Sequence, residues 1–224
     1  SSFRTLGGMQ NTFANESFMD ELAAVSGADP LEYRLRYLAE PREREVLEAA
    51  ARQADWKPRP SPRSDTGPVA EGRGLAFARY ENDQAILACI AEVQVQRASG
   101  VVRVKRIIVA HDCGLIINPD GVKNQIEGNI IQGVSRALME EVKFDSSGIT
   151  TLDWQSYPVI RFPQVPEIEI VLINRPEMPA LGGGEPSSAP IAAAIGNAIY
   201  DAVGVRLREA PFTPARVLAA LKKA

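Results

Sequence analysis

Residues 181–190 read LGGGEPSSAP, a stretch that joins three glycines and one carboxylate to an apolar helix. Apolar residues recur after it at helical spacing, at Ile191, Ile195, Ala198, Ile199 and Ala202. Ser187 and Ser188 are candidate N-caps of this helix, and Gly204 stands where a glycine commonly ends one. The stretch therefore predicts a glycine loop that leads directly into an apolar helix.

The same glycine loop is a candidate binding site. Consecutive glycines allow positive φ angles and let a ligand approach the backbone closely. Backbone N–H groups at a helix start, together with the single carboxylate of Glu185, suit a polar ligand and a proton transfer. The alternative is structural: a glycine turn that leads into a core helix, with Glu185 in solvent. The local pattern leaves both interpretations open.

The composition indicates a folded chain without a strong preference for charged partners. Its 224 residues carry a formal net charge of −3, and a chain of this length can bury a core as one large or two small domains. The weak acidic balance gives no reason to expect nucleic acid or an anionic membrane as a partner, and no apolar run approaches the roughly 20 residues of a membrane span. Because the sequence opens at Ser1 rather than Met, we expect a piece of a longer protein; the compartment, cytoplasmic or periplasmic, stays open.

Cysteine and histidine are too scarce for most metal sites. Cys89 and Cys113 lie in apolar, strand-like stretches, where buried free thiols are expected rather than a disulfide. Two cysteines cannot form a four-cysteine iron–sulfur or zinc site within the chain. The single histidine, His111, also lies in an apolar stretch and is expected to be packed structure. We therefore predict no metal-ligating residues and assign any acid–base chemistry to a carboxylate.

The first part of the chain is predicted to be helical. A glycine turn at residues 7–8 leads into a helix that Gly27 ends. The apolar stripe of this helix is expected at Ala14, Phe18, Leu22 and Val25. Asp29 and the proline after it provide an N-cap and a first residue for a second helix. Together with a third helical stretch, these elements make up an N-terminal helical segment, residues 1–54.

Beyond this segment the pattern changes twice. Residues 55–72 are rich in proline and charge, which is typical of a solvated linker. In residues 73–224, period-two patterns predict strands, with a tight turn at Ser99-Gly100. The main expected strands cover residues 74–80, 86–95, 101–110 and 167–173. A long helical pattern between the last two is carried by Ile126, Ile130, Val134 and Leu138. We therefore predict an α+β fold, in which N-terminal helices are followed by a mixed or antiparallel sheet packed with helices.

Several blocks of the sequence resemble the C-terminal part of the molybdenum hydroxylase family, which includes xanthine dehydrogenase and aldehyde oxidase. The chain is most similar to the large, molybdopterin-binding subunit of isoquinoline 1-oxidoreductase-like enzymes. The matching blocks, in the order of the family, are FANESFMDEL at 13–22, DCG and NP within 112–119, QIEG at 125–128, YPVIR at 157–161 and GEP at 184–186. The match covers nearly the whole chain, so it is far more specific than any one of these motifs.

The resemblance assigns a function and a set of site residues. It implies a molybdopterin-dependent oxidoreductase that hydroxylates an aldehyde or N-heteroaromatic carbon with oxygen derived from water, with Glu185 as the general base. It also implies that Gln125 hydrogen-bonds the pterin and that Gly184, Arg4 and Gly8 lie beside the cofactor. A carboxylate must be ionised to accept a proton, and we expect partial desolvation in a closed pocket to raise its pKa.

The resemblance also implies partners, because parts of the family's machinery have no counterpart in this sequence. It contains neither a Gly-Gln-Gly phosphate loop nor cluster-binding cysteines. We therefore expect three kinds of partner: the remaining molybdopterin-binding domains or subunit, an iron–sulfur electron-transfer subunit, plus a small-molecule substrate. The isolated chain is expected to be metal-free and inactive. The alternative is a non-catalytic binding or assembly module of a multi-subunit complex; a hydrolase that uses Glu185 with water lacks a second acid or metal ligands at recognisable spacing.

Overall fold

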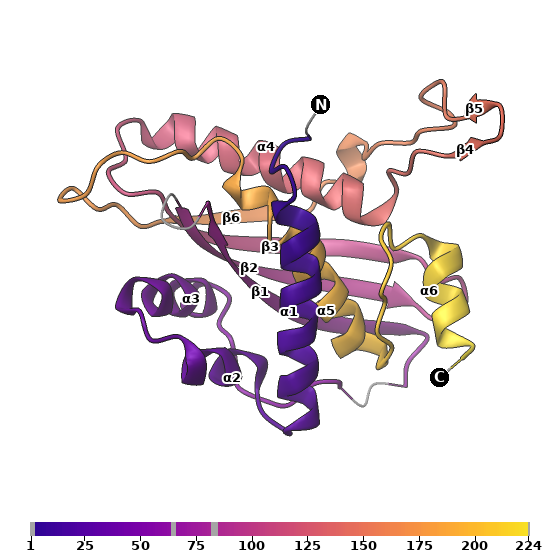
Figure 1. The fold of residues 1–224 in the computed structure, drawn as a ribbon. Coiled ribbons are helices and arrows are strands. Elements are labelled where there is room, and N and C mark those ends of the chain that lie inside the picture. Colours follow the sequence, from indigo (N-terminus) through magenta and orange to yellow (C-terminus); the bar gives the residue numbers. More distant parts are fainter. Residues whose placement is uncertain (1–2, 64–65, 82–84, 224) are drawn as a thin grey trace.

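A computed structural model describes residues 3–63, 66–81 and 85–223, and its centre is a four-stranded sheet in the order β1-β2-β3-β6 (Figure 1). The strands are β1 (Val69–Tyr80), β2 (Ala85–Gln96), β3 (Val102–Asp112) and β6 (Glu167–Leu172). The first three are antiparallel neighbours, and β6 pairs with β3 in parallel. The predicted turn at Ser99-Gly100 lies between β2 and β3, where Gly100 has a φ of 72°. The α+β fold with a mixed sheet is confirmed.

Helices cover both faces of the sheet. Helices α4 and α5 pack on one face, with α1 lying across α5, and α3 packs on the other face beside α2 (Figure 1). The helices are α1 (Gly8–Val25), α2 (Pro30–Tyr37), α3 (Pro41–Gln53), α4 (Pro119–Leu138), α5 (Ile191–Val203) and α6 (Pro214–Leu221). The short elements are β4 (Phe144–Asp145), β5 (Gly148–Ile149), η1 (Phe162–Gln164) and η2 (Pro186–Ser188). Because both faces are covered, β2 is buried along most of its length, which explains its nearly continuous apolar sequence.

Strand β1 and helix α5 approach each other very closely. A Cβ atom at Gly74 would lie 2.1 Å from the carbonyl oxygen of Ala194, and one at Gly72 would lie 2.2 Å from that of Ala198. Both glycines face the helix backbone, where a larger residue would overlap it. Since only Glu185 and a short segment that contains Pro186–Ser188 separate the glycine loop from α5, this contact also helps to position that loop.

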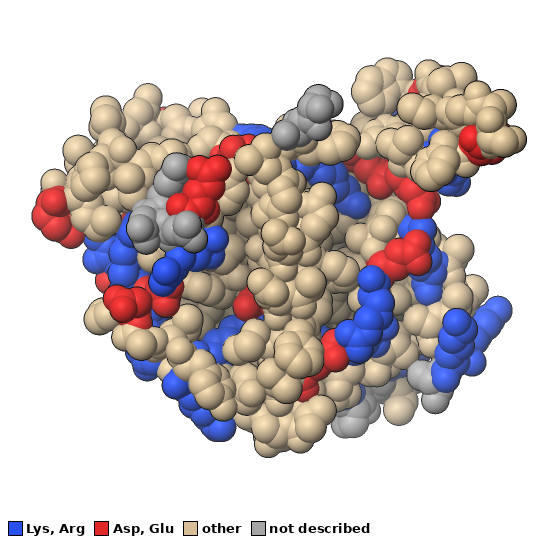
Figure 2. Space-filling model, viewed as in Figure 1, with Lys and Arg blue, Asp and Glu red and all other residues tan. Residues whose placement is uncertain are grey.

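The apolar stripe predicted for α1 is wrong. Phe18 and Val25 are 58 % and 88 % exposed, and Figure 2 shows that the surface over α1 is largely uncharged. The buried side of the helix instead carries Glu16 and Asp20. Arg34 of α2 lies between them, with its Nε donating to Glu16 Oε2 at 2.8 Å and its Nη1 3.7 Å from Asp20 Oδ1. Charged side chains can be buried where they are paired in this way. The buried face of α1 therefore carries paired charges instead of the apolar residues that the hydrophobic pattern predicted.

Two of the predicted helix boundaries are confirmed and one is wrong. Asp29 caps α2, because its Oδ1 accepts hydrogen bonds from the next two helical N–H groups at 2.9 and 3.1 Å. Gly204 ends α5 with a φ of 74°. Ser187 and Ser188 do not cap α5, which begins at Ile191 without a side-chain cap. Both serines lie in η2, and their hydroxyl groups bond to side chains of the site described below.

Some described residues of the stretch predicted as a solvated linker, residues 55–72, are anchored to the fold. Strand β1 begins at Val69, inside it. Arg59 forms a bidentate pair with the buried carboxylate of Asp201 on α5, at 2.7 and 2.6 Å. The segment is therefore fixed to α5 at Arg59, while its exposed residues, among them Lys57, Pro58 and Pro60, face solvent as the composition suggests. The division of the chain into a helical segment and an α+β domain stays a prediction.

Candidate functional site

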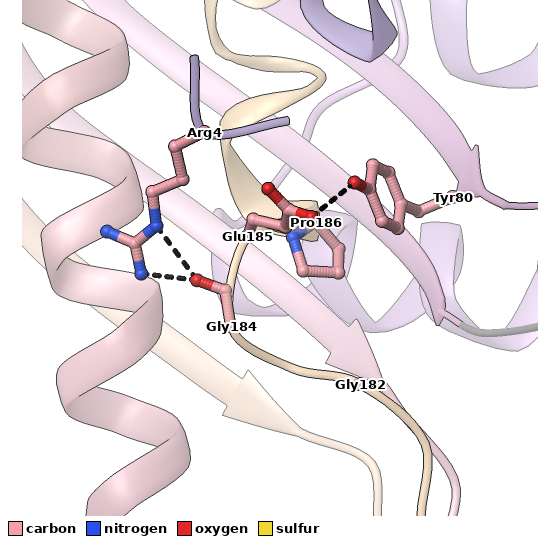
Figure 3. Close-up of a pocket in the computed structure, with 6 residues that line it drawn as sticks. All are labelled: Arg4, Tyr80, Gly182, Gly184, Glu185 and Pro186. Atoms are coloured by element: carbon pink, nitrogen blue, oxygen red, sulfur yellow. Dashed lines mark hydrogen bonds between the residues drawn. The ribbon is translucent and has the colours of Figure 1, made fainter. Parts of the chain in front are cut away.

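Glu185 lies at the end of the glycine loop and is held by two segments that are distant in sequence. The phenol of Tyr80, the last residue of β1, donates to its Oε1 at 2.7 Å (Figure 3). The backbone N–H of Thr5 donates to its Oε2, also at 2.7 Å. The hydroxyl of Thr5 donates to the main-chain carbonyl of Glu185 at 2.8 Å. Both the carboxylate and the main chain of Glu185 are therefore anchored.

These hydrogen bonds set the charge state of Glu185. The bonds from Thr5 and Tyr80 lower the pKa of the carboxyl group, and the nearby Arg4 guanidinium lowers it further, while burial opposes them. The carboxylate is thus ionised at neutral pH, as a base must be. In this chain the donors outweigh the burial of the partly exposed Glu185 side chain. The expectation that desolvation in a closed pocket raises its pKa stays a prediction. Burial and the bond to Glu185 raise the pKa of Tyr80, which therefore stays a donor.

Arg4 joins the glycine loop to helix α4. Its Nε donates to the carbonyl oxygen of Gly184 at 2.8 Å, as Figure 3 shows, and its Nη2 donates to Oε1 of Gln125 at 2.5 Å. The structure thus brings together four of the five predicted site residues, since Arg4, Gln125 and Gly184 adjoin Glu185. The guanidinium of Arg4 is used to connect protein segments, a role that the sequence did not indicate.

The fifth predicted site residue, Gly8, lies beside this cluster and makes room for Thr5. A Cβ atom at Gly8 would lie 2.9 Å from Cγ2 of Thr5 and 3.5 Å from the ring of Tyr80. Its backbone N–H donates to the carbonyl oxygen of Thr5 at 2.8 Å. Within this chain, Gly8 therefore supports the residue that binds Glu185; its contact with a cofactor stays a prediction.

Asn129 completes the cluster and was not predicted. Its Nδ2 donates to the carbonyl oxygens of Gln125, at 2.7 Å, and Gly184, at 3.2 Å. Its Oδ1 accepts a hydrogen bond from the hydroxyl of Ser188 at 2.5 Å. The available signal was the spacing of four residues from Gln125, which places both side chains on one face of a helix.

A hollow of about 360 Å³ lies in front of Glu185. It is lined by Arg4, Tyr80, Gly182, Gly184, Glu185 and Pro186 (Figure 3). None of the three loop glycines has a positive φ, and a Cβ atom at Gly183 or Gly184 would meet no atom closer than 3.7 Å. The fold of this chain therefore does not itself require glycine at those two positions. Because glycine has no side chain, the backbone there is open to a ligand.

His111 is buried beneath the loop, as predicted, and is neutral. Its Nδ1 lies 2.9 Å from the Ser187 hydroxyl oxygen, whereas its Nε2 has no hydrogen-bond partner in the described part of the chain. Burial lowers its pKa to about 4. Cys89 and Cys113 are buried free thiols, as predicted. Among residues 3–63, 66–81 and 85–223, no group of three or more His, Cys, Asp or Glu side chains could hold a metal ion.

Comparison with known proteins identifies the family and the fold of the chain. Residues 14–166, more than half of the chain, match the model of the molybdopterin cofactor-binding domain. The chain belongs to the molybdenum hydroxylase family. This molybdenum hydroxylase chain is 45 % identical over 226 residues to one of the subunits of nicotinate dehydrogenase from Pseudomonas putida, covering 97 % of this chain and 19 % of that protein. It is 37 % identical over 221 residues to the beta subunit of isoquinoline 1-oxidoreductase from Brevundimonas diminuta, covering 98 % and 27 %.

Solved structures of molybdenum hydroxylases share the fold. The aldehyde oxidoreductase of Desulfovibrio gigas superimposes with a TM-score of 0.81 at 19 % identity, covering 99 % of this chain and 42 % of that one. The predicted molybdopterin-binding fold is therefore confirmed. The chain spans about a fifth to a quarter of the length of the two relatives named above. No helix of the described residues is long and apolar enough to cross a membrane.

The cluster suits one side of a molybdopterin site. Arg4 holds the amide oxygen of Gln125, so the amide nitrogen is the group of that side chain that can donate to a ligand. Gly182 and Gly184 border the hollow without side chains. The Gln125 amide and the open backbone of the glycine loop are groups that can hydrogen-bond a polar ligand. The hollow itself is at the small end of ligand pockets, as expected for one wall of a larger site.

Proposed function

We propose that this chain provides the general base and one wall of the cofactor pocket in a molybdenum-dependent hydroxylase. The reaction would hydroxylate an electron-poor carbon with oxygen derived from water. One observation carries the proposal: Glu185 faces the hollow as an ionised carboxylate held between Tyr80 and Thr5, and the predicted pterin-binding residue, Gln125, lies in the same cluster. The molybdenum cofactor, when bound, supplies the centre that accepts two electrons.

The role of Glu185 is to accept a proton. Each carboxylate oxygen has lone-pair capacity beyond the single hydrogen bond that it receives from Tyr80 or Thr5. The two bonds fix the direction in which the remaining lone pairs point, which favours proton transfer at a defined position. A ligand that covers the hollow would remove water from the carboxylate and raise its pKa from the lowered value it has in this chain. Closure of the site would thereby make Glu185 a stronger base.

The substrate that fits this proposal best is an N-heteroaromatic compound. The two relatives named above, from a nicotinate dehydrogenase and an isoquinoline oxidoreductase, share 45 % and 37 % of residues with almost the whole chain. Nicotinate and isoquinoline both contain an aromatic ring nitrogen, which makes the neighbouring ring carbons electron-poor. Relatives named for aldehydes match less well: an aldehyde dehydrogenase of Gluconacetobacter polyoxogenes is 31 % identical over 92 % of the chain, and an aldehyde oxidoreductase subunit of Escherichia coli is 34 % identical over 57 % of it. Because both relatives are named as subunits, we also propose partner chains, among them an iron–sulfur subunit that carries the electrons away.

The decisive experiment replaces Glu185 in the complete, molybdenum-loaded enzyme. Glu185→Gln keeps the size of the side chain and its capacity to accept a hydrogen bond but removes the base. We expect turnover to fall by about 10²–10⁴, the usual contribution of a general base, at unchanged molybdenum content. Glu177→Gln is a matched control on the exposed loop before the glycines. Full turnover of Glu185→Gln with intact cofactor would show that another group is the base.

A second candidate function is a non-catalytic assembly module. It is favoured by the internal use of the Arg4 guanidinium, which bonds to Gly184 and Gln125 of the same chain. Elemental analysis separates the two candidates, because a module lacks molybdenum even beside its partner chains, whereas the proposed enzyme contains it stoichiometrically. We also predict that the isolated 224-residue chain is metal-free, and stoichiometric molybdenum in it would contradict that prediction.

A further inference from the structure

Thr5 has a strained backbone conformation next to the proposed base. Its φ is 86°, in the left-handed region that favours glycine, where a β-branched residue is an outlier. Strain of this kind persists only where surrounding contacts impose it, and it concentrates at functional sites. Thr5 is also completely buried. The contacts that impose its conformation are therefore all within the protein.

Neighbouring groups fix Thr5 on several sides. The N–H of Gly8 donates to its carbonyl oxygen at 2.8 Å. Nη1 of Arg136 donates to the carbonyl oxygen of Arg4, the preceding residue, at 2.9 Å. The methyl group of Thr5 occupies the space that a side chain at position 8 would need. The turn is thus built around a threonine, and Gly8 accommodates the threonine side chain.

This conformation directs both hydrogen-bond donors of Thr5 at one residue. Its N–H donates to the carboxylate of Glu185, and its hydroxyl donates to the main-chain carbonyl of Glu185. A glutamate side chain has three rotatable bonds, so holding one end alone leaves the carboxylate free to move relative to the loop. We infer that Thr5 is a positioning residue that clamps Glu185 at its main chain and its carboxylate. The inference rests on the proposed role of Glu185 as the base.

Two properties of Thr5 can be separated by substitution: its hydroxyl group and its strain. Thr5→Ser keeps the hydroxyl. Thr5→Val removes the hydroxyl and keeps a β-branched side chain in the left-handed region. Thr5→Gly removes the hydroxyl and also relieves the strain, because glycine adopts positive φ readily, while its N–H donor remains. If Thr5 positions Glu185, the variants with the hydroxyl group keep turnover and the variants without it lose turnover. If Thr5 only stabilises the fold, the turnover of the three variants rises and falls with their stability.

The test measures turnover per bound molybdenum, KM and thermal unfolding of the complete enzyme for all three variants. We expect Thr5→Ser to recover most of the turnover that Thr5→Val loses. Thr5→Val and Thr5→Gly are both expected to lose at least about tenfold in kcat with unchanged KM, since small displacements of a reacting group are costly. The Tm of Thr5→Gly is nevertheless expected to be higher than that of Thr5→Val, because only the glycine variant relieves the strain.

A matched control relieves left-handed strain away from the site. Asp55 has a φ of 48° just after α3, and Asp55→Gly is expected to leave turnover unchanged. The inference is overturned if Thr5→Gly is more active than Thr5→Val in step with its higher Tm, or if both retain normal turnover. Failure of the proposed function gives a different result, because Glu185→Gln would then remain active. The loss of turnover in Thr5→Val supports the inference only if Glu185→Gln is inactive as well, because Thr5 is inferred to act through Glu185.

Discussion

Replacement of Gly74 by alanine tests how closely β1 and α5 pack. The added Cβ would lie 2.1 Å from the carbonyl oxygen of Ala194 and 2.2 Å from the backbone nitrogen of Ala198. Ordinary contacts begin at about 3.4 Å, so α5 has to move away from the sheet by roughly 1.3 Å. Both clashing atoms belong to the backbone of a regular helix, which cannot yield at one residue alone. We therefore expect a displacement of the whole helix.

The magnitude follows from two opposing effects. Overpacking a well-packed core costs about 1–3 kcal/mol, and a clash with helix backbone belongs at the upper end of that range. Alanine in a strand recovers about 0.5–1 kcal/mol because it is less flexible than glycine in the unfolded chain. The net loss of unfolding free energy for Gly74→Ala is therefore about 2–2.5 kcal/mol. For a chain of this size that corresponds to a fall in Tm of roughly 4–10 °C.

Urea denaturation of the chain measures this loss as a lower midpoint with an unchanged m value. Gly183→Ala is the matched control, because its Cβ would meet no atom closer than 3.7 Å and its φ is not in the left-handed region. We expect that control to stay within about 0.5 kcal/mol of the unsubstituted chain. If Gly74→Ala is equally neutral, α5 does not pack on β1 as closely as the structure indicates, and the reasoning is refuted.

Two further predictions concern titratable groups. Tyr80→Phe removes the donor to Oε1 of Glu185, so the pKa of that carboxyl group is expected to rise. The acid limb of the pH profile of kcat/KM for the complete enzyme then moves to higher pH. An unmoved limb would contradict the assignment of Glu185 as the base. His111 has a folded-state pKa of about 4 against 6.5 in the unfolded chain, so the unfolded chain binds more protons between these values. The contribution of His111 to the unfolding free energy is therefore expected to fall, by at most about 3 kcal/mol, as the pH drops from 6.5 to 4. Urea denaturation at several pH values measures this, and His111→Gln is expected to flatten the dependence.

The sheet and most helices could be predicted because local patterns determine them. The period-two stretches became β1, β2, β3 and β6, and Asp29 and Gly204 bound helices as their chemistry suggests. The buried face of α1 could not be predicted, because it depends on charges brought from elsewhere. Glu16 is buried by Arg34, 18 residues later, and Asp20 is paired with Arg206 at the other end of the chain. No periodicity within α1 contains that information.

The site, like the fold, was predicted only where a sequence motif carries the information. Resemblance to known motifs identified Glu185 and Gln125, and the structure places them in one cluster. Tyr80 and Thr5 were not predicted, because each matters only through a partner far away in sequence: Tyr80 lies 105 residues from Glu185, and Thr5 lies 180 residues from it. A residue that positions another has no local signature of its own. The lowered pKa of Glu185 in this chain was not predicted for a related reason, since its donors come from segments that a sequence motif does not include.

Strand β1 links the packing of the fold to the geometry of the site. The strand contacts the backbone of α5 at Gly74 and ends at Tyr80, which bonds to Glu185. Helix α5 in turn begins six residues after Glu185. Strand β1 is therefore linked to α5 in two ways: directly at Gly74, and indirectly through the hydrogen bond from Tyr80 to Glu185. A retreat of α5 by roughly 1 Å would stretch the 2.7 Å bond between Tyr80 and Glu185 beyond hydrogen-bonding distance. The glycines of β1 therefore act on the base through the helix, and Gly74→Ala is expected to raise the pKa of Glu185 as well as to lower stability.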